Sequence, residues 1–281
     1  MEVNDLLSDN WIVGNLQSAF NTWNDKLTEI WSLVTTSPET FRGGAIWTAI
    51  VGINDALKAV AYGLLVLFFA MGIFQSAASF KDFQRPEFFI RFVAAKVAVS
   101  SAMEIMTAVY SVCGGVVQSV MGSMGGMTAA SVSVPQEMVT TIESVGFLAS
   151  IPLWLVTVLG SLFITVLSFI LIMTVYGRFF RLYMYTALAP LPLASFAGEG
   201  TSFAGKAFLK SYIGVCLEGA VIVLACLIFS AFASTSTPTL NTSLSAVTMS
   251  WQYVAETIFN MMVLVGLVKG AERIIKEMLG L

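Results

Sequence analysis

Apolar residues concentrate in five segments that are each long enough to cross a lipid bilayer. A transmembrane helix needs about 20 mostly apolar residues to span roughly 30 Å of hydrocarbon. The second and fifth segments are weaker because Lys96, Glu104 and Glu256 lie within them. The pattern predicts an all-α fold, a polytopic integral membrane bundle with five transmembrane helices, over Ala59–Phe80, Phe92–Val112, Phe147–Tyr176, Tyr212–Phe232 and Trp251–Val268.

An amphipathic helix is predicted before the first segment. Its apolar residues recur every three or four positions, while Asn21, Asp25 and Glu29 lie on the opposite face. This mildly acidic face favours a partner helix or the outer membrane interface over anionic lipid, and packing on the chain's own bundle is the alternative. The apolar positions are Ile12, Leu16, Phe20, Trp23, Leu27, Ile30, Trp31 and Val34.

Composition supports a membrane protein and argues against catalysis. The chain has 281 residues, of which 57% are hydrophobic and 11% charged, whereas a soluble domain carries about 25% charged residues. Histidine is absent, which removes the usual general base and the commonest metal ligand. Cys113, Cys216 and Cys226 match neither a zinc site nor a disulfide framework. We expect no enzymatic activity, no cofactor and no bound metal.

Basic residues predict the orientation, because cytoplasmic loops of membrane proteins are enriched in Lys and Arg. Residues 113–146 and 233–250 contain neither residue type, and basic and non-basic segments alternate as five spans require. The N-terminus is therefore predicted outside and the C-terminus in the cytoplasm. The N-terminal residues lack a basic stretch before an apolar core, so we expect no cleavable signal peptide. The basic segments contain Lys81, Arg85 and Arg91; Arg178, Arg181, Lys206 and Lys210; and Lys269, Arg273 and Lys276.

Polar residues form stripes inside two of the predicted spans. In the second span, Lys96, Ser100, Glu104, Thr107 and Ser111 recur at a spacing that places them on one helical face. A charged group at the bilayer centre costs about 2.5–3.5 kcal/mol on insertion scales, so such groups usually face a partner or water. A shorter stripe in the fifth span contains Gln252, Glu256 and Asn260, and Glu218 interrupts the fourth span.

Two interpretations of these polar residues remain open. In the first, they form internal ion pairs that fix packing, with Lys96 pairing with Glu218 and Lys58 with Glu104. In the second, they line a translocation path or a subunit interface. The residues concerned are Lys96, Ser100, Glu104, Thr107, Glu218, Glu256 and Asn260.

A near match to a phosphate-binding loop occurs at residues 200–207, GTSFAGKA. The final position is Ala207, which lacks the hydroxyl that would hold magnesium, and no strand pattern precedes the segment. We therefore expect no nucleotide binding. Gly205 and Lys206 instead indicate a turn that begins the approach to the fourth span.

The segment GRFFRLYMYTALAPLPLASFAGEG, residues 177–200, follows the long third apolar run. Arg178 and Arg181 are expected to anchor the cytoplasmic end of that helix by snorkelling. Pro190 and Pro192 disfavour helix before them, so the chain must turn in an apolar setting that protein buries. We predict a packed cytoplasmic elbow within residues 177–210. The predicted domains are an extracytoplasmic amphipathic segment over 1–44 and a transmembrane domain over 45–281.

The chain resembles the TrbL-type family, the polytopic membrane subunit of conjugative type IV secretion systems. The resemblance lies in a long apolar helix with an Arg-x-x-[Leu/Tyr]-rich exit, an Ala-Pro-Leu turn, and a Phe and a Lys before another apolar helix. The segment SPETFRGGAIW, residues 37–47, is also similar to the variant carried by integrative conjugative elements of Firmicutes. The resemblance covers roughly residues 37–281. The matching residues are Arg178, Arg181, Tyr183, Ala189, Pro190, Leu191, Phe203 and Lys206.

The resemblance implies a non-enzymatic, homo-oligomeric subunit of a translocation channel in the cytoplasmic membrane. Its implied partners are a stalk or pilus-base protein outside, secretion ATPases or the coupling protein inside, and membrane lipid. It also implies transient contact with single-stranded DNA. The alternative function is a small-solute or ion transporter that uses Lys96, Glu104 and Glu218, and that function predicts flux through the purified protein alone.

Overall fold

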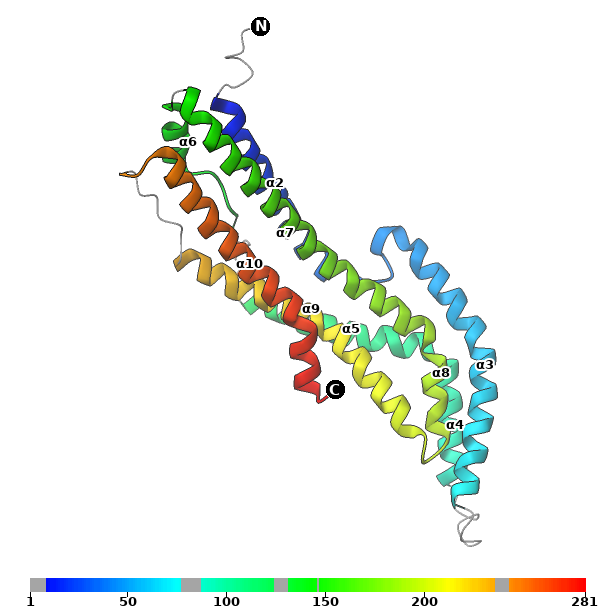
Figure 1. Ribbon diagram of the computed structural model, residues 1–281. Coiled ribbons are helices and arrows are strands. Elements are labelled where there is room, and N and C mark those ends of the chain that lie inside the picture. Colours follow the sequence, from blue (N-terminus) through cyan, green and yellow to red (C-terminus); the bar gives the residue numbers. More distant parts are fainter. Residues whose placement is uncertain (1–8, 77–86, 124–130, 146, 236–242) are drawn as a thin grey trace. The chain divides into compact units, whose positions relative to one another are not determined.

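The computed structural model describes residues 9–76, 87–123, 131–145, 147–235 and 243–281 (Figure 1). Helices joined by short turns account for these residues, which contain no strand. The longer helices are α2 (Asp9–Thr35), α3 (Ala45–Ser76), α4 (Glu87–Ser100), α5 (Ala102–Ser123), α7 (Phe147–Leu188), α9 (Ser202–Thr235) and α10 (Ala246–Leu279). The shorter ones are η1 (Phe41–Gly44), α6 (Gln136–Glu143), α8 (Pro190–Leu193) and η3 (Ala194–Ala197).

Five helices within the described residues are long and apolar enough to cross a membrane. The predicted all-α fold with five candidate spans is therefore confirmed, while the orientation of the termini stays a prediction. The candidate spans are Phe41–Phe74, Ala102–Gly122, Ser150–Leu188, Ser202–Ala233 and Ala246–Leu279.

The second span is displaced from its predicted position. The prediction placed it at Phe92–Val112, but the helix is interrupted at Ser101 and the candidate span begins at Ala102. Lys96 consequently lies in α4, before the span. The displacement removes Lys96 from the span but leaves Glu104 in its first turn, followed by the uncharged residues 105–122.

Two compact units can be distinguished in the chain. The first comprises Met1–Val34, Val120–Val175 and Val221–Ala271, and the second comprises Thr35–Ser119, Tyr176–Ala220 and Glu272–Leu281. Helices α5, α7, α9 and α10 each contribute residues to both units. The predicted division of the chain at residue 44 remains a prediction.

In the first unit, the apolar face of α2 is buried within the chain itself. Its apolar positions from Ile12 to Val34 are almost completely covered, apart from the half-buried Trp31. Trp11 stacks on Trp154 of α7 with ring centroids 5.8 Å apart. The amphipathic helix is thus confirmed, and its apolar face packs on the chain's own helices, which was the alternative interpretation.

In the second unit, the elbow packs against α3 and α4. Pro190 occupies the first position of α8, where a helix requires no backbone N–H donor. The backbone stays helical through Ala189, so the predicted non-helical turn at the prolines is wrong, and the chain reverses between η3 and α9 instead. The expectation that protein buries this apolar segment is confirmed, since its inward residues Ala189, Leu193, Ala194 and Ala197 join one core cluster with residues of α3 and α4.

Candidate functional site

Arg178 and Arg181 lie in the interior of α7, ten and seven residues before its end at Leu188. The prediction that they anchor the end of this helix by snorkelling is therefore wrong. Arg178 is only 1% exposed. Its Nε donates to the carbonyl oxygen of Val215 at 3.2 Å, and its Nη2 donates to that of Cys216 at 3.1 Å. These carbonyls from α9 replace water as hydrogen-bond partners, which allows the helix to continue past the charge.

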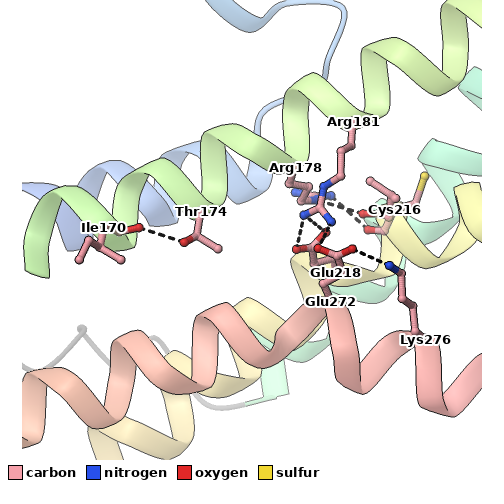
Figure 2. A network of polar contacts seen from close by, with 9 residues as sticks. Ile170, Thr174, Arg178, Arg181, Cys216, Glu218, Glu272 and Lys276 are labelled. Atoms are coloured by element: carbon pink, nitrogen blue, oxygen red, sulfur yellow. Dashed lines mark hydrogen bonds and ion pairs between the residues drawn. The ribbon is translucent and has the colours of Figure 1, made fainter.

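Arg181 connects α7 to α9 and α10 by ion pairs (Figure 2). Its Nη2 donates to both carboxylate oxygens of Glu218, at 2.7 and 2.9 Å. Its Nη1 pairs with Glu272, which also accepts a 2.7 Å hydrogen bond from Lys276. Glu218 is 2% exposed, whereas the Lys276 side chain is 57% exposed, so the network leads from the interior to the surface. We refer to Arg178, Arg181, Glu218, Glu272 and Lys276 as the charged cluster.

The predicted ion pair between Lys96 and Glu218 is not formed. The carboxylate of Glu218 is occupied by Arg181, and Lys96 is exposed on α4. The predicted pair between Lys58 and Glu104 is not formed either, because Lys58 pairs with Asp55 one turn earlier on α3 at 2.9 Å. Both predicted pairs were inferred from helix position alone, which cannot identify a closer partner on a third helix or on the same helix.

The polar stripe of the second predicted span faces away from the core of its unit. Lys96, Ser100 and Glu104 are exposed, and Thr107 is half-buried. The covered positions lie one or two residues before those of the stripe, at Ala95, Val99, Ala102 and Met106. Each residue of offset corresponds to a rotation of about 100° around the helix. The internal ion-pair interpretation thus fails for Lys96 and Glu104, and the surface they form is available to a neighbouring molecule or to water.

The stripe of the fifth span is partly covered. Gln252 donates to the carboxylate of Glu256 at 3.1 Å, within α10. Gln252, Glu256 and Asn260 are all half-buried. They belong to the first unit, whereas Lys96, Glu104 and Glu218 belong to the second. The transporter alternative needs Lys96, Glu104 and Glu218 to form a relay, but the observed partner of Glu218 is Arg181.

Three elbow residues that were candidates lie outside the charged cluster. Pro190 is buried, Pro192 is half-buried, and Lys206 is exposed in the first turns of α9. Gly205 and Lys206 follow a turn and a 3-10 helix rather than a strand, which agrees with the interpretation of GTSFAGKA as a turn and the start of a helix. No group of three or more potential metal-ligating side chains occurs in the part of the chain that the structure describes.

A cavity of about 390 Å³ adjoins the charged cluster. Arg181, Glu218, Glu272 and Lys276 line it together with Tyr185 and Ser211. Sequence reasoning identified Arg181 and Glu218 but missed Glu272 and Lys276. Their spacing of four residues is a signal for an ion pair on one helix face, although it does not indicate that Arg181 would join the pair.

The ion pairs of the charged cluster hold α7, α9 and α10 together, and the cluster contains no paired nucleophile and base. Searches of curated proteins and of solved structures found no match. A protein-family model described as TrbL/VirB6 plasmid conjugal transfer like protein matches residues 23–190, which is more than half of the chain. The match includes Arg178, Arg181 and Pro190 of the motif that resembled this family. The chain therefore belongs to the TrbL/VirB6 plasmid conjugal transfer-like family, and it is a multi-pass membrane component of conjugal transfer by type IV secretion.

Proposed function

We propose that this protein is a non-enzymatic subunit of the type IV secretion channel in the cytoplasmic membrane. It assembles with further copies of itself and helps DNA or a DNA–protein substrate across that membrane. A stalk or pilus-base protein contacts it outside, and secretion ATPases or the coupling protein contact it inside. Family membership supports the role in conjugal transfer, and the surface of α4 and α5 supports the role in an assembly.

The observation that carries this proposal is the exposed stripe of Lys96, Ser100 and Glu104. Glu104 lies in a candidate membrane span and faces outward from its own unit. Insertion scales give about 2.5–3.5 kcal/mol for a charge at the centre of a span, and Glu104 is in the first turn of its span, so the cost of leaving it in lipid is smaller. Contact with another subunit, or with water inside an assembled conduit, removes this cost. Either arrangement would place the protein in a complex.

The test is conjugal transfer to recipient cells. The gene is deleted from its host element without disturbing its neighbours, and the intact gene is restored in trans. Transfer should be lost on deletion and recovered on restoration. Complementation with Glu104→Leu should lower transfer about tenfold or more. A tenfold loss corresponds to about 1.4 kcal/mol of assembly free energy. The amount of the variant in the membrane should equal that of the wild type.

The matched control is Val112→Leu, which changes an exposed apolar residue two turns further along α5. This variant should complement fully. Undiminished transfer without the gene would refute the proposal. The transporter alternative is tested separately by reconstituting the purified protein in vesicles, where a channel subunit without its partners should give no solute or ion flux.

A further inference from the structure

We propose that Asn54 of α3 is a positioning residue for conjugal transfer. Its side chain donates to the backbone carbonyl that Pro190 leaves without a helical donor, and this hydrogen bond sets the register of α3 on the elbow. The residues concerned all belong to the second unit. The inference rests on the family's part in conjugal transfer, and it does not depend on the proposed channel role.

Pro190 removes one hydrogen bond from the helical backbone that runs from α7 into α8. In a helix, the N–H of residue 190 would donate to the carbonyl of Thr186, four residues earlier. Proline has no backbone N–H, and its ring also crowds that carbonyl. The N–H of Ala189 lies 3.4 Å from the same oxygen, which is longer than an ordinary N–H···O bond. The carbonyl of Thr186 therefore needs a donor from another part of the chain.

Asn54 supplies that donor. Its Nδ2 donates to the carbonyl oxygen of Thr186 at 2.7 Å, although the two residues are 132 positions apart in the chain. Asn54 is completely buried and Thr186 is 1% exposed, so water does not take the place of either partner. Membrane helices tolerate proline where a neighbouring helix satisfies the freed backbone group. Helix α3 provides this compensation for α7.

Packing alone does not account for an asparagine at position 54. The Oδ1 atom of Asn54 is buried and has no hydrogen-bond partner among the described residues. A buried acceptor without a donor is costly, and an apolar side chain of similar size would avoid this cost. Asn54 also lies in the candidate membrane span Phe41–Phe74, where apolar residues predominate. The bond from Nδ2 to Thr186 is the feature that favours asparagine here.

The rest of the contact between α3 and the elbow consists mostly of small apolar groups, where α3 runs beside α8 (Figure 1). A Cβ added to Gly72 would lie only 3.1 Å from the Cα of Gly198. Surfaces of small side chains permit more than one alignment, and a buried polar contact selects one, as a single buried asparagine does in coiled coils. A shift of α3 by one turn, about 5.4 Å, would break the bond from Asn54. The apolar members of this contact are Ala61 and Leu65 of α3 and Ala189, Leu193, Ala194 and Ala197 of the elbow.

The test combines substitutions of Asn54 and Pro190. Asn54→Leu leaves the carbonyl of Thr186 without its donor and should lower transfer to recipient cells about tenfold. Pro190→Ala restores a backbone N–H, so the double variant should transfer within about threefold of the wild type. The unpaired Oδ1 is lost in both backgrounds and does not affect this comparison. Pro190→Ala alone should transfer like the wild type, because a carbonyl oxygen can accept two hydrogen bonds.

Hydrogen–deuterium exchange of the purified full-length protein in detergent gives a second readout. The backbone amides of residues 186–194 should exchange about tenfold faster in Asn54→Leu and recover in the double variant, while those of α2 should not change. This pattern distinguishes local loss of docking from general destabilisation, and it remains measurable if gene deletion refutes the proposed function. If Asn54→Leu fails to accumulate in the membrane, Pro190→Ala should restore its level.

The matched control is Thr186→Val. It removes the hydroxyl that donates to the carbonyl of Leu182 within α7 at 2.8 Å, but it keeps the carbonyl that Asn54 binds. Its transfer and its exchange should equal those of the wild type. Equal losses from Asn54→Leu with and without Pro190→Ala would overturn the proposal. So would wild-type transfer by Asn54→Leu, or the same loss in Thr186→Val as in Asn54→Leu.

Discussion

At the scale of single residues, the buried guanidinium of Arg178 depends on the absence of a side chain at Gly219. A Cβ at this position would lie 2.7 Å from Cζ of Arg178 and 2.8 Å from both Nη atoms. Because the carbonyls of Val215 and Cys216 hold the guanidinium, it cannot move aside without losing hydrogen bonds. Gly219→Ala should therefore lower the free energy of unfolding by about 1–3 kcal/mol, as measured by denaturant titration in detergent micelles.

The control for this substitution is Gly177→Ala in α7. No heavy atom lies within 4 Å of a Cβ built at Gly177, so alanine should fit without strain. It should leave stability unchanged or raise it by up to about 1 kcal/mol, which is the helix-propensity advantage of alanine over glycine. If both variants had the same stability, the close contact between Arg178 and α9 would be wrong.

The ion pair between Arg181 and Glu218 should show strong energetic coupling. Arg181→Met leaves the 2% exposed carboxylate of Glu218 without the Nη2 group that donates to both of its oxygens, and breaking a buried pair costs about 3–5 kcal/mol. The double variant Arg181→Met with Glu218→Met should recover most of this loss, because no buried charge then remains unpaired between them. Unfolding titrations of the two single variants and the double variant measure the coupling.

The exposed pair of Arg273 and Glu277 on α10 provides the comparison for this cycle. Exposed pairs contribute little to stability, so Arg273→Met should be indistinguishable from the wild type. Additive losses in the Arg181 and Glu218 cycle would contradict the buried contact that the structure shows.

At the scale of helices, Gly160 permits the close packing of α7 with α10 and α2 in the first unit. A Cβ at Gly160 would lie 2.5 Å from Cγ1 of Val254 and 3.7 Å from Cδ2 of Leu16. Gly160→Ala should destabilise the protein by about 1–3 kcal/mol. Adding Val254→Ala should restore part of that loss, with a coupling of about 0.5–3 kcal/mol. Thermal unfolding of the three variants tests this contact, and a fully additive double variant would exclude it.

The sequence predicts a helix and its buried face well where the apolar residues follow one strong helical periodicity. The spacing from Ile12 to Val34 predicted α2 and its buried face, because every apolar position of one helical stripe is filled. The length of α7 was not predictable in the same way. Arg178 and Arg181 have the local pattern of a membrane boundary, and their partners Val215, Cys216 and Glu218 lie 37 or 38 residues away in the chain. Only tertiary contact shows that these charges are compensated inside the structure.

The polar stripe illustrates the same limit for the candidate site. Lys96 and Ser100 of α4 and Glu104 of α5 are all exposed, although the helix is interrupted at Ser101 between them. Whether the stripe pointed inward or outward could not be decided, because the residues one position away, such as Ala95 and Val99, are small or apolar and suit either a core or lipid. Burial of those neighbours in the structure resolves the direction of the stripe.

At the scale of the whole molecule, five spans require the two ends of the membrane domain to lie on opposite sides. The displacement of the second span to Ala102–Gly122 leaves the number of candidate spans unchanged. It also keeps Arg91 before that span and the segment from residue 131 after it. The distribution of basic residues thus still predicts an outer location for residues near Ser131 and a cytoplasmic location for Arg273.

Cysteine accessibility in intact cells tests this orientation with little background, because Cys113, Cys216 and Cys226 are all buried. Ser131→Cys and Arg273→Cys each introduce a thiol at an exposed position. A membrane-impermeant maleimide should label the first variant in intact cells and the second only after the membrane is permeabilised. The reverse result would invert the topology, and it would place the exposed end of the charged cluster, at Lys276, on the outer side. Labelling of both thiols in intact cells would mean an even number of spans between them, so one of the three later candidate spans would not cross the membrane.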